Sequence, residues 1–489
     1  MLNIDFDNTY ARELEGLYIP VEGAPAPAPE MLLLNEDLAR ELGLDPDALK
    51  SPAGMAMLTG SAMPDGAAPL AMAYAGHQFG GFSPQLGDGR ALLIGEVIDR
   101  NGERRDIHLK GSGRTPFSRG GDGKAALGPV LREFILGEAM HHLGIPTTRA
   151  LAAVATGETV WRETPMPGAV LARVAASHLR VGTFQFFHAR GDMARLRRLA
   201  DYAIARHDPD LAVAEDRYAR FLDRVIARTM KLVAQWMAVG FVHGVMNTDN
   251  TAISGETIDY GPCAFVDAYD PNAVFSSIDS FGRYAYGRQP VLAQWNLARL
   301  AETLLPLIAP ENPEQALPGV QAAIERAPAL FAAERRARFA AKLGIAEPGA
   351  EDEARIDAFL ALLAGAKADF TLSFRSLAQA AGGSDTALWA QVRGAPSLAD
   401  WLADWRARIA AQPGGAEAAA ARIEAVNPIY IPRNHRVEEA LAAAGKGDLA
   451  PTRRLLQTLA TPFTPRPDCA DLEGPAPEDF GPYVTFCGT

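Results

Sequence analysis

A predicted β-hairpin that ends in a lysine places the strongest constraint on what this chain can fold into. β-type runs at residues 91–98 and 106–110 flank Asn101-Gly102, a pair that tolerates the positive φ angles of a tight hairpin turn. Side chains alternate between the two faces of a strand, so Lys110 points away from the face that holds the apolar Leu109. We therefore expect an antiparallel hairpin that presents one cation at the end of its second strand.

The remainder of the chain changes from β to helical character near residues 185–190. Apolar side chains beyond this point recur at the spacing of helices, and the region from about residue 311 is predicted to be mostly helical. The other predicted elements are helices at 31–44, 129–143, 218–239 and 295–305, β-like runs at 170–175 and 181–187, and a short hairpin within 251–261.

Length, charge and cysteine content exclude several classes of protein. The 489 residues give room for several domains, and the net charge of −12 argues against a protein that coats nucleic acid. No apolar run approaches the roughly 18 residues of a membrane-spanning helix, and three cysteines are too few for a disulfide framework. We expect a cytoplasmic protein without a nucleic-acid or membrane partner.

An ordered series of polar residues matches the pattern of protein kinases. Kinases pair a strand lysine with a glutamate on the next helix, and Lys110 and Glu133 have this arrangement, with Glu138 as the alternative partner. Taken alone, these residues are more simply interpreted as a surface lysine and two solvated glutamates. The later residues of the series make the kinase-type interpretation the stronger one.

The catalytic-loop pattern is present with one departure. In kinases, H-R-D-x-x-x-x-N supplies a catalytic Asp and a metal-binding Asn, and the sequence from His243 to Asn250 keeps this spacing. The position of the catalytic Asp holds Val245, which cannot take a proton, and the nearest acid is Asp249. Asp259-Tyr260-Gly261 then matches the metal-binding Asp-Phe-Gly. Amide and carboxylate oxygens suit Mg²⁺, so Asn250 and Asp259 are the predicted metal ligands.

Glycine-rich turns and arginines are further candidates for phosphate binding. Gly87-Asp88-Gly89-Arg90 precedes the first strand, and Asp122-Gly123 lies in a glycine-rich loop; glycines let backbone N–H groups approach phosphates, although ordinary tight turns have the same composition. Arg173 and Arg180 are seven residues apart, which places them on opposite faces of a continuous strand. A bend between them would let them converge, and the sequence leaves both arrangements open.

These features predict an α+β, protein-kinase-like two-lobe fold. The expected divisions are a β-rich nucleotide-binding lobe with one key helix at 1–187, a helical lobe with the catalytic and metal-binding loops at 188–310, and a helical C-terminal extension at 311–489. Ligand sites tend to lie in the cleft between such lobes.

Over nearly its whole length, the chain resembles the selenoprotein O family. The resemblance rests on long strings, most of which include the candidate residues above. They are YAGHQFGGFSPQLGDGRA at 74–91, HLKGSGRTPFSRGGDGKAAL at 108–127, REFILGEAMHHLGIPTTRAL at 132–151, ARVAASHLRVGTFQ at 172–185, HGVMNTDNT at 243–251, DYGPCAF at 259–265, FGRYAYGRQP at 281–290, WNLARLAETLLPL at 295–307 and NPIYIPRNHRVEEAL at 427–441.

The resemblance implies a pseudokinase that binds ATP in reversed orientation and transfers AMP to Ser, Thr or Tyr hydroxyls of proteins, with pyrophosphate as the product. It implies Asp249 as general base and Asn250 and Asp259 as ligands of Mg²⁺, with Mn²⁺ as the alternative metal. UMP transfer from UTP and self-modification stay open. The nucleotide-binding residues that it implies are Gly87, Gly89, Arg90, Lys110, Asp122, Gly123, Glu133, Arg173, Arg180 and Asp259.

The cysteines show one departure from this family. The third residue from the end is selenocysteine or cysteine in the family, and Cys487 occupies that place. Some members link it to a cysteine in the activation segment, but the corresponding segment here, at 272–283, has none. Cys263 is the nearest candidate, and a small core residue is the favoured interpretation of it.

Two other classes of function compete with AMP transfer. A true phosphotransferase would use Asp249 as its base. A non-catalytic nucleotide-binding scaffold would explain the loss of an acid at Val245.

Overall fold

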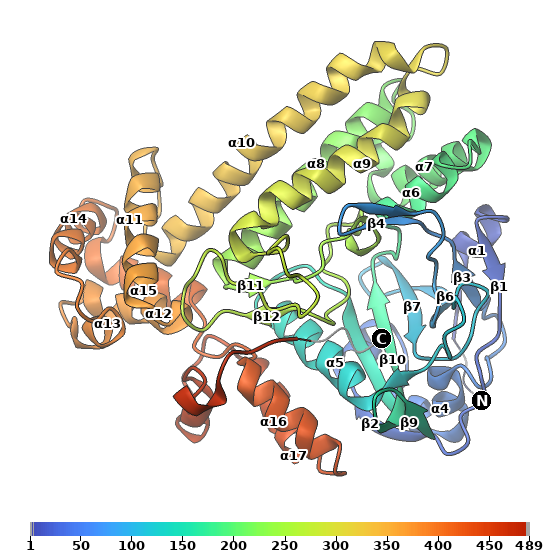
Figure 1. Ribbon diagram of the computed structural model, residues 1–489, viewed down its shortest axis with the longest axis horizontal. Coiled ribbons are helices and arrows are strands. Elements are labelled where there is room, and N and C mark those ends of the chain that lie inside the picture. Colours follow the sequence, from blue (N-terminus) through green and yellow to red (C-terminus); the bar gives the residue numbers. More distant parts are fainter. Residues whose placement is uncertain (1, 3, 486–489) are drawn as a thin grey trace.

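The computed structural model describes residue 2 and residues 4–485, and it combines an antiparallel sheet with many helices (Figure 1). Eight strands of the described residues form one sheet in the order β1-β3-β6-β7-β10-β9-β2, with β8 paired to β10. These strands are β1 Tyr18–Pro20, β2 Glu30–Leu34, β3 Leu70–Met72, β6 Ala91–Ile98, β7 Arg104–Lys110, β8 Ala125–Ala126, β9 Arg149–Trp161 and β10 Pro165–Ala175. Two small pairs complete the strands, β4 Gly76–Gln78 with β5 Gly81–Ser83, and β11 Phe241–Val242 with β12 Ala264–Phe265.

The helices divide into those that pack against the sheet and a larger group that follows it. Figure 1 shows α8, α9 and α10 as long neighbours, α11 to α15 far from the sheet, and α16 and α17 close to α5. The bounds are α1 Thr9–Glu13, α2 Glu36–Glu41, α3 Pro46–Lys50, α4 Pro52–Thr59, α5 Leu127–His142, α6 Val181–His188, α7 Met193–His207, α8 Arg217–Ala238, α9 Gln289–Ile308, α10 Leu317–Lys342, α11 Glu351–Ala366, α12 Phe370–Ala381, α13 Thr386–Gln391, α14 Leu398–Ala410, α15 Gly415–Val426, α16 Asn434–Ala444 and α17 Ala450–Leu459.

The predicted hairpin is present and follows the predicted alternation. β6 and β7 pair antiparallel around the 101–102 turn, and Ile107 and Leu109 are fully buried in one apolar cluster with residues of α2 to α4. Lys110 lies on the other face and contacts α5. The sheet therefore holds its lysine fixed because the apolar side of β7 is anchored in a core.

Three local predictions were wrong. Residues 181–187 form α6, not a strand, because Val181, Phe184 and Phe187 are buried at the spacing of a helix. The predicted helix at 31–44 is split, since β2 pairs with β9 and Asn35 then caps α2 by accepting a hydrogen bond from the Leu38 amide at 3.1 Å.

The predicted hairpin within 251–261 is also absent from the described structure. A turn does occur there, but Ala252 pairs with Arg180 and Thr257 pairs with Thr147. The two arms of the turn have different partners, so tertiary contacts replace the pairing of one arm with the other. None of the helices in residues 2 and 4–485 has the length and apolarity that crossing a bilayer requires.

A buried arginine ties α16 to the helical region. The Arg433 side chain is fully buried, and its guanidinium lies 2.6 Å from carboxylate oxygens of both Asp267 and Asp369. Burial of ionised carboxylates is costly without a partner.

Replacing Arg433 with methionine is therefore expected to destabilise the fold by about 3–5 kcal/mol, because two acids lose their buried counter-charge. The shift of the urea unfolding midpoint checks this prediction. Arg436→Met, at a partly exposed site on the same helix, is the control and should change the midpoint little. An equally small shift for Arg433→Met would contradict the assignment.

Candidate functional site

Lys110 contacts two other predicted site residues, Glu133 and Asp259. Its ammonium nitrogen lies 2.6 Å from Glu133 Oε2 and 3.0 Å from Asp259 Oδ1. β7 supplies the lysine and α5 supplies the glutamate, and Asp259 comes from the loop that precedes β12. Glu138 is not the partner of Lys110, because its carboxylate binds Arg149 and the Ala150 amide. The structure thus selects Glu133 from the two alternatives.

A second cation reaches the same glutamate. Arg173, on β10, donates from Nη1 to Glu133 Oε1 at 2.9 Å. Burial by itself would raise the pKa of Glu133, but Lys110 and Arg173 outweigh burial and lower it. Glu133 is therefore an ionised, buried carboxylate held between two cations.

Arg180 lies in the same network as Arg173, which settles the question that the sequence left open. β10 ends at Ala175, and the chain bends before Arg180 begins α6. The Arg173 Nε donates to His108 Nδ1 at 3.3 Å, and His108 Nε2 lies 3.1 Å from Asp88. Asp88 lies 3.6 Å from the guanidinium of Arg180. The two arginines therefore converge through His108 and Asp88.

Asp249 is a buried carboxylate with spare hydrogen-bonding capacity. Its Oδ2 accepts from Gln78 Nε2 at 3.2 Å, and its Oδ1 has no partner within the described residues. Burial raises the pKa of Asp249 to about 6. A Cβ atom at Gly76 would lie 2.3 Å from Oδ1, so only glycine allows β4 to approach this acid. Arg180 donates from Nη1 to the Asp249 carbonyl at 3.1 Å.

The predicted metal ligands present the oxygen donors that Mg²⁺ prefers. Asn250 donates from Nδ2 to the Val245 carbonyl at 3.1 Å, which leaves its amide oxygen as the donor for a cation. Asp259 has a φ of +67°, an uncommon conformation for a residue other than glycine. Burial opposes its ionisation, but Lys110 holds the pKa of Asp259 well below its usual range. Amide and carboxylate oxygens are the donor types that suit a hard divalent cation, and the role of Asn250 and Asp259 as metal ligands stays a prediction.

The predicted glycine turns at Gly87–Gly89 and Gly123 allow their loops to pack closely against neighbouring chain segments. Gly87 has a φ of +74°, and a Cβ there would lie 2.3 Å from the Phe117 ring. The Ser118 hydroxyl donates to the Gly89 carbonyl, and Gly111 N donates to the Arg90 carbonyl at 2.7 Å. A Cβ at Gly123 would lie 2.1 Å from a backbone oxygen. These contacts fix the loops, and Arg90 also lowers the pKa of Asp259.

Asp122 is not joined to this network by any contact within the described residues. It is exposed, and its carboxylate lies 2.8 Å from Arg162. The structure therefore links Lys110, Glu133, Arg173 and Asp259 through direct contacts. Arg180 and Asp249 connect to this group through Asp88 and His108, and Asp122 is exposed outside it.

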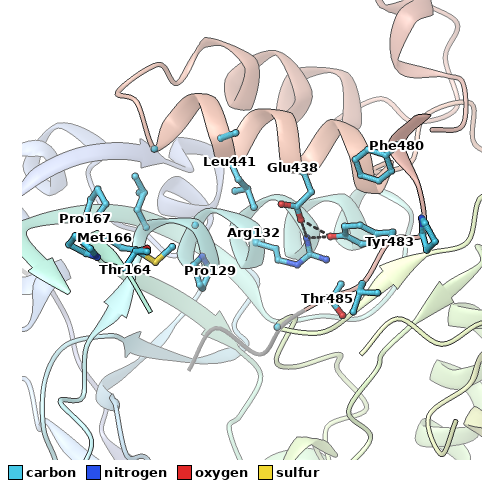
Figure 2. A pocket seen from close by; sticks show the side chains of 18 residues that line it. Pro129, Arg132, Thr164, Met166, Pro167, Glu438, Leu441, Phe480, Tyr483 and Thr485 are labelled. Atoms are coloured by element: carbon cyan, nitrogen blue, oxygen red, sulfur yellow. Dashed lines mark hydrogen bonds and ion pairs between the residues drawn. The ribbon is translucent and has the colours of Figure 1, made fainter. Parts of the chain in front are cut away.

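The C-terminal segment contacts α5 and α16, and Figure 2 shows Tyr483 beside Arg132 and Glu438. Arg132, next to Glu133, donates to the Tyr483 hydroxyl at 2.9 Å and to Glu438 at 3.2 Å. The same guanidinium donates to the Cys263 carbonyl at 2.5 Å. These side chains line part of a cavity of about 820 Å³ between α5, α16 and the tail. The C-terminal tail thus packs against α5, the helix that holds Glu133.

The cysteine predictions have different outcomes. Cys263 is fully buried in the main apolar cluster, and burial raises its thiol pKa to about 12, as expected of a small core residue. Cys469 is also buried. Cys487 lies outside the described residues, so its pairing stays a prediction.

Sequence reasoning missed four residues that support the site. Asp88 and His108 were adjacent to candidates but had no assigned role, and Gly76 and Gln78 lay inside a family string without a physical reason. A histidine beside Lys110 on the same strand face was the available signal for His108. No local pattern identified the approach of Gly76 and Gln78 to Asp249, since about 170 residues separate them.

A second histidine, His178, stacks on His108 of this network. The rings of His108 and His178 are 4.2 Å apart, and His178 Nδ1 lies 3.0 Å from Asp106. Burial lowers the pKa of His178 to about 3. Its Nε2 is buried without a partner in the described residues, so a second proton there would have no acceptor.

The free energy of unfolding should therefore decrease as the pH falls below about 6.5, the ordinary pKa of histidine. Below this pH the unfolded chain binds a proton at His178, whereas in the folded protein the pKa of His178 is about 3. The slope approaches about 1.4 kcal/mol per pH unit well below pH 6.5, and the expected loss from this residue between pH 7 and pH 5 is about 2 kcal/mol. Urea unfolding between pH 7 and 5 measures it. His178→Asn keeps a donor toward Asp106 and should show a correspondingly shallower slope; an unchanged slope would contradict the neutral assignment.

Comparison with known proteins gives a family for this arrangement. The family described as "Protein adenylyltransferase SelO" matches residues 1–460. A protein of Cereibacter sphaeroides called "Protein nucleotidyltransferase YdiU" is 60% identical over 486 residues, which are 99% of each chain. Proteins of the same name from Mycolicibacterium smegmatis and a Bradyrhizobium species are 54% and 53% identical over at least 98% of each chain. The resemblance seen in the sequence is confirmed, and the chain belongs to the SelO family.

Proposed function

We propose that the chain is a protein adenylyltransferase, which transfers AMP from ATP to Ser, Thr or Tyr hydroxyls of proteins and releases pyrophosphate. The observation that carries the proposal is the exchange of acid position in the catalytic loop, taken together with the family to which the chain belongs. Val245 is buried and without charge at the kinase base position, whereas Asp249 is a buried acid with a raised pKa and one oxygen that has no partner among the described residues. The family and the names of the relatives support a nucleotidyltransferase.

The proposed chemistry assigns each charge a role. Asp249 accepts the proton of the attacking hydroxyl, which bonds to the α-phosphorus as the bond to the bridging oxygen of pyrophosphate breaks. A pKa of about 6 leaves Asp249 ionised at neutral pH. Lys110, Arg173 and Arg180 stabilise charge on the phosphates. Asn250 and Asp259 would hold Mg²⁺, or Mn²⁺, which neutralises charge on the phosphate oxygens when bound.

We also propose a kinase-like, two-lobe arrangement with this site at the boundary. Lys110, Glu133 and Arg173 come from the sheet and α5, within the proposed lobe 1–187. Asp249, Asn250 and Asp259 come from 188–310, and 311–489 would be the helical extension. ATP would lie in reversed orientation, with its α-phosphate toward Asp249. In support of this, Arg180 contacts the Asp249 backbone and adds a cation on that side.

Labelled nucleotides test the proposal. The full-length protein is incubated with a protein acceptor, Mg²⁺ and ATP labelled at either the α- or the γ-phosphate, and the mass of the modified acceptor is measured. AMP transfer gives α-label and the mass of AMP on a hydroxyl side chain. γ-Label alone would establish a phosphotransferase, and nucleotide binding without transfer of either label would establish a scaffold. A parallel reaction with UTP and Mn²⁺ compares UMP transfer.

A further inference from the structure

Lys342, at the end of α10, is a buried basic residue without a counter-ion in the part of the chain that the structure describes. Its side chain is only 4% exposed, and its ammonium nitrogen lies 4.3 Å from the centroid of the Phe374 ring and 5.3 Å from that of Phe370. Aromatic faces attract cations, but they do not replace a carboxylate. Burial alone lowers the pKa of Lys342 to about 7, and no acid in residues 2 and 4–485 opposes this shift. An amine with a pKa of about 7 is charged in only part of the molecules at neutral pH, and an anion beside it would stabilise the charged form.

A second cation lies one turn earlier on the same face of α10. Arg338 and Lys342 are four residues apart, a spacing that places two side chains next to each other on a helix. Arg338 Nε is buried without a partner in the described structure, and its one ion pair is with Glu334 at 3.3 Å. Burial lowers the pKa of Arg338 as well. Like charges at this spacing repel each other, and an anion beside both side chains would relieve the repulsion.

Arg338 and Lys342 are both among the residues that line one cavity. The cavity has a volume of about 230 Å³ and lies between α10, the end of α8, the loop after α5, and the end of α15. Its walls are mostly apolar and include Leu143, Ile145, Val239, Val426 and Phe463. None of its lining residues belongs to the candidate nucleotide site, and its volume is too small for a nucleotide.

We propose that this cavity binds a small organic monocarboxylate, with the carboxylate at Lys342 and Arg338 and an apolar body against the surrounding walls. The carboxylate supplies the missing counter-charge, and a guanidinium is well suited to a carboxylate because its donors form a planar fork. Inorganic phosphate is the poorer match, since it has no apolar part to cover the walls. The site is independent of the proposed transfer reaction.

Benzoate is the probe, and benzyl alcohol is its uncharged counterpart. Binding to the full-length protein is measured by calorimetry and by the rise in thermal unfolding temperature. We expect saturable benzoate binding, at least tenfold weaker binding of benzyl alcohol, and at least tenfold weaker benzoate binding by Lys342→Met. Lys446→Met removes an exposed lysine elsewhere and should bind benzoate as the wild type does.

Folding of the variant is checked without any probe. Lys342→Met conserves length and replaces a buried amine with an apolar side chain, so its unfolding temperature should equal or exceed that of the wild type. Arg338→Met, at a less buried position, is a second variant that should also weaken benzoate binding. Equal benzoate affinity in the wild type and both variants would overturn the proposal. Failure of both benzoate and hexanoate to bind, or saturation by inorganic phosphate alone, would overturn it too.

Discussion

Replacing Asp259 with asparagine is expected to lower nucleotidyl transfer by about a hundredfold to a thousandfold, the usual cost of removing one charge-stabilising group from an active site. Asp259 is the carboxylate that meets Lys110 at 3.0 Å and the stronger of the two proposed metal ligands. Asparagine is the most specific substitution, because it removes the charge and still tolerates the φ of +67° at this position. Alanine would add backbone strain to the loss of charge.

The measurement is the rate of AMP transfer as a function of Mg²⁺ concentration. Asp259→Asn should fold normally, since Lys110 keeps Glu133 at 2.6 Å, and should need more metal for its residual rate. Asp270→Asn, at an exposed acid in the segment after β12, is the control. Full activity with unchanged metal dependence in Asp259→Asn would refute the metal assignment.

For Asp249→Asn, we expect a fall in kcat of about 10²- to 10⁴-fold, the range associated with loss of a general base. The substitution preserves shape, and the amide oxygen can still accept from Gln78, so the loop should keep its conformation. Binding of ATP should change little, because the proposed phosphate contacts come mainly from Lys110, Arg173 and Arg180. The effect should therefore appear in kcat and not in nucleotide affinity.

Single-turnover transfer and equilibrium ATP binding separate these two effects. Gln78→Glu is a useful companion, because a second acid beside Asp249 should raise the pKa of Asp249 further and move the pH dependence of transfer upward. A large loss of ATP affinity in Asp249→Asn with kcat intact would show that Asp249 binds nucleotide and is not the base.

Local chemistry explains why part of this site could be predicted from the sequence. The β6–β7 hairpin, the face of Lys110 and helix α5 with Glu133 depend on turn propensity and side-chain periodicity within about 30 residues. The choice of Glu133 over Glu138 needed the tertiary structure, because both lie on one helix and only the packing of α5 against the sheet decides which one meets Lys110. The helix at 181–187 was mistaken for a strand because a short apolar run fits both periods.

The sequence by itself determined the hairpin that ends in Lys110, the helical character beyond residue 190, and the order of acids and amides around Val245 and Asp249. Only the tertiary structure decided that Arg173 and Arg180 converge through His108 and Asp88, and that Gly76 and Gln78 enclose Asp249. The physical reason is the range of the forces involved. Backbone sterics and side-chain periodicity act between near neighbours, whereas the burial and pairing of charges depend on which distant segments the packed core brings together.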